Sequence, residues 1–324
     1  MRDRYGPPEV VEVREIERPT PKDDEVLVRV HAASVNRADL DGLYPRWQLS
    51  RLFLGVRRPR SPGLGLDVAG VVKSVGPNVT RFKPGDRVFG DLFNFGQSAF
   101  AEYVAAPEKA FLPIAAEIPF DQAATLPHSA VLALQGLRLR NGRTIKPDDT
   151  VLVVGASGNV GPFVVQIAKS MGAHVTGVAR GDKLDFVRSL GADEVIDYTK
   201  VDYTRTGRRF DWIVDVDAHH SVLRWRASLT PRAVYVAMGG PGSWLLQALF
   251  VAPLASIATG NHMGLLFWWK PFNPPDVETL EALIAAAKLR PVIDRRFPLS
   301  EVVEALRYVD EGQARGKVVI TVAD

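Results

Sequence analysis

The apolar residues of 113–260 occur in two patterns, continuous runs and helical spacing. Short apolar runs rich in β-branched residues are typical of strands, and they predict strands at 150–154, 174–179, 210–215 and 233–238. After the first run, apolar residues recur at helical spacing, which predicts a helix with one buried face: they stand at 160, 163, 164, 167, 168 and 171. Strands that alternate with helices predict an α/β fold with a doubly wound parallel sheet.

The flanking regions have a different pattern. Residues 1–112 contain short apolar runs, such as EVLVRVHAAS and DVAGVVKSVG, separated by Pro, Gly and Asp, and this predicts a β-rich region. After residue 260 the pattern is mixed, with helices expected near 276–288 and 300–311 and a closing strand in GKVVITV. The chain therefore divides into β-rich end segments and a central α/β segment.

One stretch, residues 233–269, contains no Asp, Glu, Lys or Arg. Its most apolar part, WLLQALFVAPLASIA at 244–258, is shorter than a membrane span, and we expect Pro253 to break it. A buried core, a subunit interface and peripheral contact with a membrane surface through 244–258 are all compatible with this pattern.

Composition narrows the class of protein. A length of 324 residues favours two domains. The balance of 40 basic and 37 acidic residues, a net charge of +3, is too mild to indicate nucleic-acid binding. The chain has no cysteine, which excludes disulfides, thiolate nucleophiles and cysteine-ligated zinc. The beginning MRDRYGPPEVVEV has no apolar segment typical of a signal peptide, so a cytoplasmic location is expected.

A glycine-rich turn joins the predicted strand at 150–154 to the helix after it. The motif G-x-G-x-x-G, with alanine in place of its first glycine and Gly155 just before it, is matched by Ala156, Ser157, Gly158, Asn159, Val160 and Gly161. In a strand–turn–helix unit, small residues let the backbone approach a pyrophosphate, and the free N–H groups of the helix stabilise the anion. The turn is therefore predicted to bind a dinucleotide; the alternative is a tight turn that binds nothing.

The end of the next strand indicates which dinucleotide is preferred. In NAD-specific folds, an acidic residue about 20 positions after the first glycine accepts hydrogen bonds from the ribose 2′-OH. Here Ala179 and Arg180 stand at that place, and Lys183 follows. Asp182 is the counter-argument, but two cations against one carboxylate favour NADPH. The alternative is a set of ordinary exposed charges at a strand–helix turn.

Several multi-residue motifs resemble one known family in the same order along the chain: ASVNRADL, GLDVAGVVKSVGPNVTRFKPGDRVFG, AFAEYV, GASGNVG, LGADEVIDY and GKVVITV. They resemble the zinc-independent quinone oxidoreductase branch of the medium-chain dehydrogenase/reductases. The resemblance implies a GroES-like β-rich catalytic domain, residues 1–112 completed by 261–324, around a Rossmann NADP-binding domain at 113–260. It also implies an active site between the domains and, because the chain starts later than usual, a truncated or missing first strand.

The resemblance also allows the zinc ligands to be compared residue by residue. Zinc-dependent relatives have a cysteine three residues before the aspartate that corresponds to Asp39, and a histidine after the glycine that corresponds to Gly65. Here Asn36 and Leu66 stand at those places, and neither side chain is a good zinc ligand. No metal is predicted.

Without a metal, the expected chemistry is hydride transfer from a reduced nicotinamide to an electron-poor acceptor. The resemblance places Asn36 beside the nicotinamide and Tyr44 near the substrate, where its phenol could donate to a developing oxyanion. It also assigns Lys183 and Tyr198 to the cofactor phosphate. Structural roles remain the alternatives, a turn-stabilising amide for Asn36 and packing for Tyr44. Asp39 and Asp67 are expected to be structural, and water is expected to deliver the proton.

These features predict an NADPH-dependent reductase of quinones or other α,β-unsaturated carbonyls. An enoyl-thioester reductase is one alternative, favoured by a basic and aromatic segment that contains Arg46, Trp47, Arg51, Phe53, Arg57, Arg58 and Arg60, although a solvated loop is the simpler interpretation. A non-enzymatic NADPH-binding sensor or nucleic-acid-binding protein is another. Because relatives pair through the Rossmann domain, a homodimer is expected.

Overall fold

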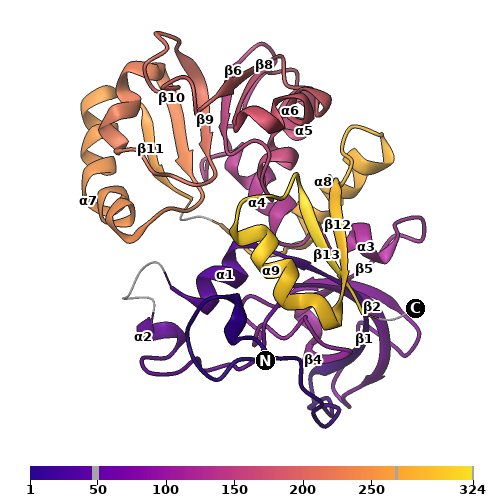
Figure 1. The fold of residues 1–324 in the computed structure, drawn as a ribbon. Helices are drawn as coiled ribbons and strands as arrows, with labels where there is room; N and C mark the ends of the chain where they lie inside the picture. Colours follow the sequence, from indigo (N-terminus) through magenta and orange to yellow (C-terminus); the bar gives the residue numbers. More distant parts are fainter. Residues whose placement is uncertain (46–50, 267–268, 323–324) are drawn as a thin grey trace. The chain divides into compact units, whose positions relative to one another are not determined.

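A computed structural model of the chain describes residues 1–45, 51–266 and 269–322 (Figure 1). The chain forms two compact units. Unit 1 comprises Met1–Val131, Pro271–Glu281 and Pro291–Asp324, and unit 2 comprises Leu132–Lys270 and Ala282–Arg290. The C-terminal segment thus returns to the unit that the N-terminal segment begins.

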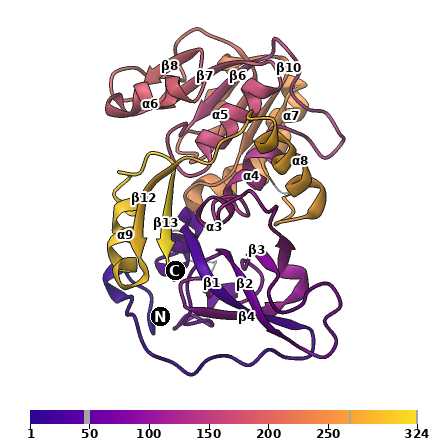
Figure 2. The same cartoon turned by 90° about the vertical axis from the view of Figure 1, so that its right-hand side faces the viewer.

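Unit 1 is built on a mainly antiparallel sheet in the order β12-β13-β1-β2-β3-β5, with β4 also paired to β1 (Figure 2). Its strands are β1 (Glu25–Val35), β2 (Asp67–Val75), β3 (Arg87–Asp91), β4 (Tyr103–Pro107), β5 (Phe111–Pro113), β12 (Ile293–Pro298) and β13 (Lys317–Thr321). Alternating β-branched residues of β1, including Val26, Val28 and Val30, are fully buried in its core. Ala32 of β1 lies opposite Thr321 of β13, so the two ends of the chain share one sheet.

Short helices accompany this sheet: α1 (Arg37–Leu43), α2 (Arg51–Leu54), α3 (Phe120–Ala123) and α9 (Val302–Asp310), with 3-10 turns η1 (Pro8–Val10), η3 (Glu108–Ala110) and η6 (Leu299–Glu301). Helices α4 (Ser129–Gly136) and α8 (Pro274–Ala285) contribute residues to both units. Residues 1–24 contain η1 and no strand. The predicted helices near 276–288 and 300–311 and the closing strand are confirmed.

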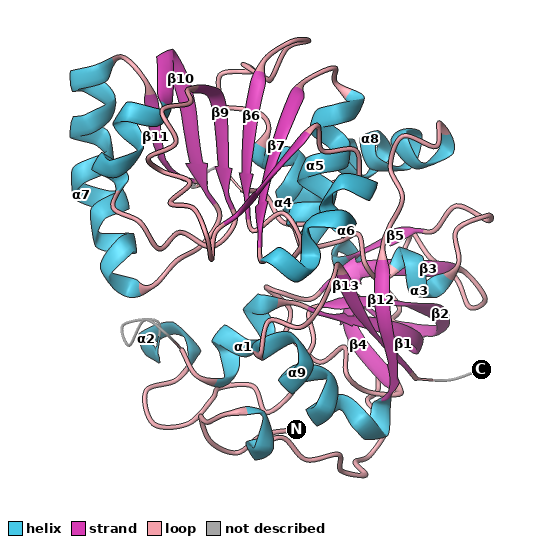
Figure 3. Ribbon diagram, turned by 45° about the horizontal axis from the view of Figure 1, so that its top comes forward, coloured by secondary structure: helices cyan, strands magenta, loops and turns pink. Residues whose placement is uncertain are grey.

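Unit 2 is a parallel sheet in the order β11-β10-β9-β6-β7-β8 (Figure 3). Its strands are β6 (Thr150–Val154), β7 (His174–Ala179), β8 (Glu194–Asp197), β9 (Phe210–Asp215), β10 (Leu229–Ala237) and β11 (His262–Leu265). Its helical elements are α5 (Gly161–Ser170), α6 (Leu184–Ser189) and α7 (Gly242–Thr259), with 3-10 turns η4 (Gly181–Lys183) and η5 (Val222–Ser228). Strands β6, β7 and β9 have the predicted bounds, whereas β10 begins earlier, at Leu229, because Leu229 pairs with Phe210 of β9.

Helix α7 corrects one expectation. Pro253 does not break the apolar segment, because it lies inside one continuous helix that packs beside β11 (Figure 1). A proline removes one backbone donor, and the remaining hydrogen bonds and the packing of Trp244 and Ala252 preserve the helix. The opposite side is exposed, with Leu254 at 68% and Ile257 at 82%. By length and composition alone, α7 meets the requirements of a membrane span, which is weak support because core helices do so too.

Candidate functional site

The glycine-rich turn follows β6 and has backbone positions that require glycine. Gly155 has a φ of +77°, which favours glycine. A Cβ atom on Gly161 would lie 2.2 Å from the Gly155 carbonyl oxygen, so only glycine permits this close packing of helix on strand. A Cβ on Gly158 would meet only that same oxygen, at 3.6 Å, so the backbone borders open space there. The predicted residues Gly155, Ala156, Ser157, Gly158, Asn159, Val160 and Gly161 together form this turn, and α5 begins at the last of them.

The predicted phosphate-binding residues gather at the ends of β7 and β8. Arg180 donates from Nε and Nη2 to the two carboxylate oxygens of Asp182, at 2.6 and 3.0 Å. The hydrogen bond from Arg180 holds the pKa of Asp182 below its usual value. Lys183 is 5% exposed, so it is not the ordinary surface charge that the alternative interpretation assumed. Tyr198 is half-exposed, and its N–H donates to the carbonyl of Ala179, the last residue of β7.

The glycine-rich turn and the predicted phosphate-binding residues lie at the same edge of the sheet of unit 2. Strands β6, β7 and β8 are parallel neighbours, so the turn after β6 and Arg180 after β7 share the carboxyl edge. The Ala156 N–H donates to the Val178 carbonyl at 3.0 Å and fixes the turn to β7. Dinucleotides bind at this edge in open parallel sheets. The turn therefore fits the pyrophosphate of a dinucleotide, and binding of a 2′-phosphate by Arg180 and Lys183 stays a prediction.

Asn36 lies in a buried polar cluster of unit 1. Its Oδ1 accepts hydrogen bonds from Lys317 Nζ at 2.6 Å and Ser129 Oγ at 3.0 Å. Its Nδ2 donates to Asp67 Oδ2 at 2.9 Å and, more weakly, to the Ser34 carbonyl at 3.4 Å. The amide uses both its acceptor and its donor capacity inside the protein, and Asn36 is only 1% exposed. Its contact with a nicotinamide stays a prediction and would require one of these bonds to exchange.

Asp67 and Lys317 form the charged centre of this cluster, with Nζ 3.4 Å from Oδ2. Asp67 also accepts hydrogen bonds from Ser34 Oγ at 2.8 Å and from the His128 backbone N–H at 2.9 Å. Burial raises the pKa of Asp67 and lowers the pKa of Lys317, and the attraction between them opposes both shifts. Buried charges persist when such hydrogen bonds replace water. Sequence reasoning treated Asp67 as structural but missed Lys317 and Ser129, which stand far away in the chain.

A second pair adjoins this centre. His128 Nδ1 lies 3.0 Å from Asp91 Oδ2, and Asp91 Oδ1 accepts the Phe93 N–H at 2.8 Å. Burial lowers the pKa of His128, but the attraction and hydrogen bond of Asp91, with help from Asp67, outweigh it, so the pKa is raised. Sequence reasoning found no acid–base pair because these residues stand 37 positions apart and no motif joins them. The sequence showed only that Asp91 ends a strand and that His128 precedes a helix, which does not indicate that the two side chains pair.

Tyr44 ends α1 and lies in a different set of contacts. Its phenol donates to Asp310 Oδ1, which also accepts Arg37 Nη1 at 3.2 Å. Burial and this hydrogen bond raise the pKa of Tyr44. Within the described ranges, no hydrogen bond joins Tyr44 to the Asn36 cluster, so the structure does not unite the two predicted catalytic residues directly. A role for Tyr44 as an oxyanion donor stays a prediction, and it would require release of Asp310.

Asp39 stabilises the start of α1. Its Oδ2 accepts the Asn36 N–H at 2.7 Å, and burial raises its pKa to about 7. Leu66 is fully buried. In the parts of the chain that the structure describes, no group of three or more His, Cys, Asp or Glu side chains has an arrangement that could hold a metal ion.

The arginine-rich segment is only partly covered, because Arg46 and Trp47 lie outside the described residues. Arg51 stacks over the Tyr5 ring at 4.8 Å, and Arg60 Nη2 donates to the Leu52 carbonyl at 3.3 Å. These two arginines therefore make local contacts within unit 1.

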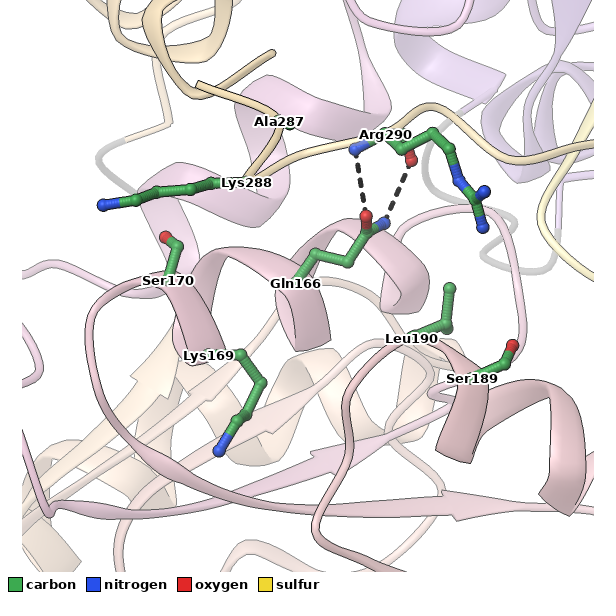
Figure 4. Close-up of a pocket in the computed structure, with 8 residues that line it drawn as sticks. All are labelled: Gln166, Lys169, Ser170, Ser189, Leu190, Ala287, Lys288 and Arg290. Atoms are coloured by element: carbon green, nitrogen blue, oxygen red, sulfur yellow. Dashed lines mark hydrogen bonds between the residues drawn. The ribbon is translucent and has the colours of Figure 1, made fainter. Parts of the chain in front are cut away.

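A polar cavity of about 580 Å³ lies in unit 2, lined by Gln166, Lys169, Ser170, Ser189, Leu190, Ala287, Lys288 and Arg290 (Figure 4). The Gln166 amide accepts the Arg290 N–H at 2.9 Å and donates to the Arg290 carbonyl at 3.1 Å. Lys169 and Ser170 are the last residues of α5, whereas the glycine-rich turn precedes that helix. The cavity is therefore distinct from the glycine-rich turn.

Comparisons with known proteins cover almost the whole chain. Two family models match: the alcohol dehydrogenase GroES-like domain over residues 22–116 and the zinc-binding dehydrogenase over residues 190–320. The NAD(P)H oxidoreductase RTN4IP1, mitochondrial, of Mus musculus is 34% identical, covering 92% of this chain and 82% of the relative. The 2-methylene-furan-3-one reductase of Solanum lycopersicum is 32% identical, covering 98% and 76%. The solved quinone oxidoreductase from Coxiella burnetii superposes with a TM-score of 0.86 at 29% identity, covering 99% and 98%.

Proposed function

Because this chain belongs to the quinone oxidoreductase branch of the medium-chain dehydrogenase/reductase superfamily, we propose that it reduces quinones or other α,β-unsaturated carbonyls with NADPH, without a metal. Membership makes it an oxidoreductase with a GroES-like domain and a Rossmann sheet, and its relatives are named for NAD(P)H. The finer proposal rests on one observation. The glycine-rich turn, which borders open space at Gly158, lies at the same edge of the sheet as Arg180 and Lys183.

NADPH is favoured over NADH by the charges at the end of β7. Two cations and one carboxylate leave one net positive charge among Arg180, Asp182 and Lys183. A 2′-phosphate can replace Asp182 as the partner of Arg180, because both side chains are nearly half exposed and exchange costs little burial. A 2′-OH would gain much less from this site than a phosphate.

The acceptor class follows from the chemistry of the site. The reduced nicotinamide supplies a hydride when it is bound, and a conjugated carbonyl accepts it because conjugation spreads the added charge. The zinc-ligand positions hold Asn36 and Leu66, so this chain's own residues must position the acceptor and stabilise its charge. One relative is named for a quinone and another for an unsaturated furanone, and these names support quinones and other α,β-unsaturated carbonyls as acceptors.

An acceptor screen tests this proposal. Purified protein is mixed with NADPH and, separately, with quinones, enals, enones and a crotonyl thioester, and oxidation is followed by absorbance. Turnover with quinones or enones supports the proposal. Turnover confined to the thioester would instead establish the enoyl-thioester alternative. NADPH binding without any turnover would indicate a non-enzymatic binding protein.

A homodimer also belongs to this proposal. β11 is the edge strand of the parallel sheet, and α7 beside it exposes Phe250, Leu254 and Ile257. An open strand edge next to an apolar helix face is a surface that a second copy can cover. Light scattering at micromolar concentration should give twice the chain mass of 35.5 kDa. A monodisperse monomer would contradict the proposal, and liposome flotation would then test membrane contact.

A further inference from the structure

Asp182 occupies the guanidinium of Arg180, the residue that follows β7 at the carboxyl edge of the sheet of unit 2. Arg180 Nε donates to Asp182 Oδ1 at 2.6 Å, and Nη2 donates to Oδ2 at 3.0 Å. A guanidinium binds a phosphate through the same pair of parallel hydrogen bonds. Among residues 1–45, 51–266 and 269–322, Asp182 is the only hydrogen-bonding partner of this guanidinium. The carboxylate therefore uses the donors that a phosphate would need.

The backbone between these two residues is held by a different carboxylate, that of Asp197 at the end of β8. A Cβ atom on Gly181 would lie 2.5 Å from Asp197 Oδ2, so this carboxylate packs directly on the backbone of Gly181. Asp197 accepts a hydrogen bond from the Gly181 N–H, and its Oδ1 accepts the N–H and Oγ1 of Thr199 at 3.0 and 2.7 Å. Loss of the Asp182 carboxylate therefore leaves the turn anchored.

The ion pair of Arg180 and Asp182 is accessible to an incoming anion. Its side chains are 43% and 47% exposed, and exposed ion pairs are weak because water and salt screen them. The hydrogen bond from Arg180 lowers the pKa of Asp182, so the carboxylate is charged at neutral pH. Asp182 is therefore a permanent negative charge on Arg180 that a second anion can displace but must also approach.

We propose that Asp182 is a specificity-determining residue that competes with the cofactor 2′-phosphate for Arg180. The inference rests on the proposed function and deepens it. The ribose 2′ position is contacted at the end of the second strand of a dinucleotide fold, and β7 is the strand that follows the glycine-rich turn. NADPH must then displace Asp182 from Arg180, whereas NADH binds with the ion pair intact. Asp182 therefore limits the preference for NADPH.

Removal of this carboxylate changes the site in two ways that favour a phosphate. The donors of Arg180 become available, and the formal charge of Arg180, Asp182 and Lys183 rises from one net positive charge to two. A cofactor without the 2′-phosphate gains from neither change. A residue that instead oriented Arg180 for the phosphate would have the opposite effect, because its removal would weaken binding of NADPH. The direction of the change in affinity thus distinguishes a competitor from a positioning residue.

The adenosine halves of the two cofactors isolate this site. Adenosine 2′,5′-bisphosphate and adenosine 5′-monophosphate differ only in the 2′-phosphate, and titration calorimetry on the full chain gives their dissociation constants and those of NADPH and NADH. At low ionic strength, Asp182→Asn should bind the bisphosphate and NADPH about threefold to tenfold more tightly than wild type. The monophosphate and NADH should stay within about twofold. The gain should shrink at an ionic strength of about 0.5 M, because salt screens exposed charges.

Asp185→Asn is the matched control for the loss of one negative charge. Asp185 lies in α6, three positions after Asp182, and pairs with Arg188 at 2.6 Å instead of with Arg180. This variant should alter all four dissociation constants by less than about twofold. The double variant Arg180→Ala with Asp182→Asn tests the mechanism. Compared with Arg180→Ala alone, it should bind the bisphosphate less than about twofold more tightly, because the carboxylate then has no guanidinium to occupy.

The outcomes separate this inference from the proposed function. Unchanged or weaker binding of the bisphosphate by Asp182→Asn would overturn the role of Asp182 as a competitor. An equal gain in Asp185→Asn, or in the Arg180→Ala background, would also overturn it, because general charge would then explain the effect without Arg180. Wild-type protein that binds neither NADPH nor the bisphosphate would overturn the proposed function itself.

Discussion

Two ion pairs, one in each unit, differ in how far they are removed from water. In unit 1, Asp67 and Lys317 are buried, and each charge is held by several hydrogen bonds. In unit 2, Arg180 and Asp182 form their ion pair with 43% and 47% of their side chains exposed. A buried pair is costly to break because the remaining partner stays desolvated, whereas an exposed pair contributes about 0–1 kcal/mol.

The difference in burial suits the two ion pairs to different roles. The pair in unit 1 fixes the orientation of the Asn36 amide and has little freedom to change partners. The pair in unit 2 can open for an anionic ligand at small cost. A buried pair of this kind suits positioning, whereas an exposed pair suits contact with an exchangeable ligand.

The largest effect is expected from Lys317→Met, which removes the cation from the buried cluster. Asp67 would lose its cation, and Asn36 Oδ1 would lose one of its two donors, without gaining water. We expect the free energy of unfolding to fall by about 3–5 kcal/mol, measured by chemical denaturation. Lys200→Met is the matched control, because Lys200 is 80% exposed in its pair with Asp197 and should cost about 0.5 kcal/mol or less. Equal losses of unfolding free energy in both variants would contradict the expected difference between a buried and an exposed ion pair.

Unit 2 also contains buried charged groups, and Asp215 is one of them, a buried carboxyl at the end of β9. Tyr235 donates to it at 3.0 Å, and burial raises its pKa to about 7. The folded state then holds this proton more tightly than the unfolded state, so stability decreases as pH rises from about 4 through 7. Asp215→Asn should flatten this decline by up to about 3 kcal/mol between pH 5 and 8. The measurement is the free energy of unfolding against pH, with the fully exposed Asp185→Asn as control; parallel curves for all three proteins would contradict the expectation.

Cofactor selectivity tests whether the exposed Arg180–Asp182 pair can open for an anionic ligand. Arg180→Ala and Lys183→Ala should each weaken NADPH by about tenfold, since one charge-assisted contact contributes roughly 1.5–3 kcal/mol. Binding of NADH should barely change. Dissociation constants for both cofactors come from titration calorimetry, and melting curves check that Lys183→Ala still folds, because this lysine is buried. Wild-type protein that binds NADH as tightly as NADPH would show that the assignment is wrong.

The smallest effect is expected from metal removal. Exhaustive chelation should leave turnover unchanged, because Asn36 and Leu66 replace the zinc ligands of relatives. Elemental analysis of the purified chain is the companion measurement. One zinc per chain, or activity lost on chelation and restored by zinc, would contradict a metal-free reaction.

The sheet of unit 2 was predictable because its strands are continuous apolar runs rich in β-branched residues. β6 and β7 have the predicted bounds for that reason. The glycine-rich turn was predictable because its residues are consecutive. The continuity of α7 through Pro253 was not, because packing against its neighbours decides whether a helix survives a lost hydrogen bond.

The cluster in unit 1 was not predictable from local pattern. Lys317 and Asn36 stand 281 positions apart, and neither shows in sequence that it will be buried. The burial of Lys183 was missed for the same reason, because a lysine after a strand is typical of a surface turn. Partners of polar side chains depend on tertiary contacts, which one sequence without an alignment does not reveal.

The pairing of β13 with β1 has a consequence for synthesis on the ribosome. Residues 132–270 supply most of unit 2 as one uninterrupted segment, so this sheet can assemble while the chain is still growing. Unit 1 cannot: β1 keeps an open edge and Asp67 lacks its cation until Lys317–Thr321 has left the exit tunnel. A nascent chain arrested before residue 317 would therefore expose the unpaired edge of β1 at residues 32–35, which chaperones and proteases recognise.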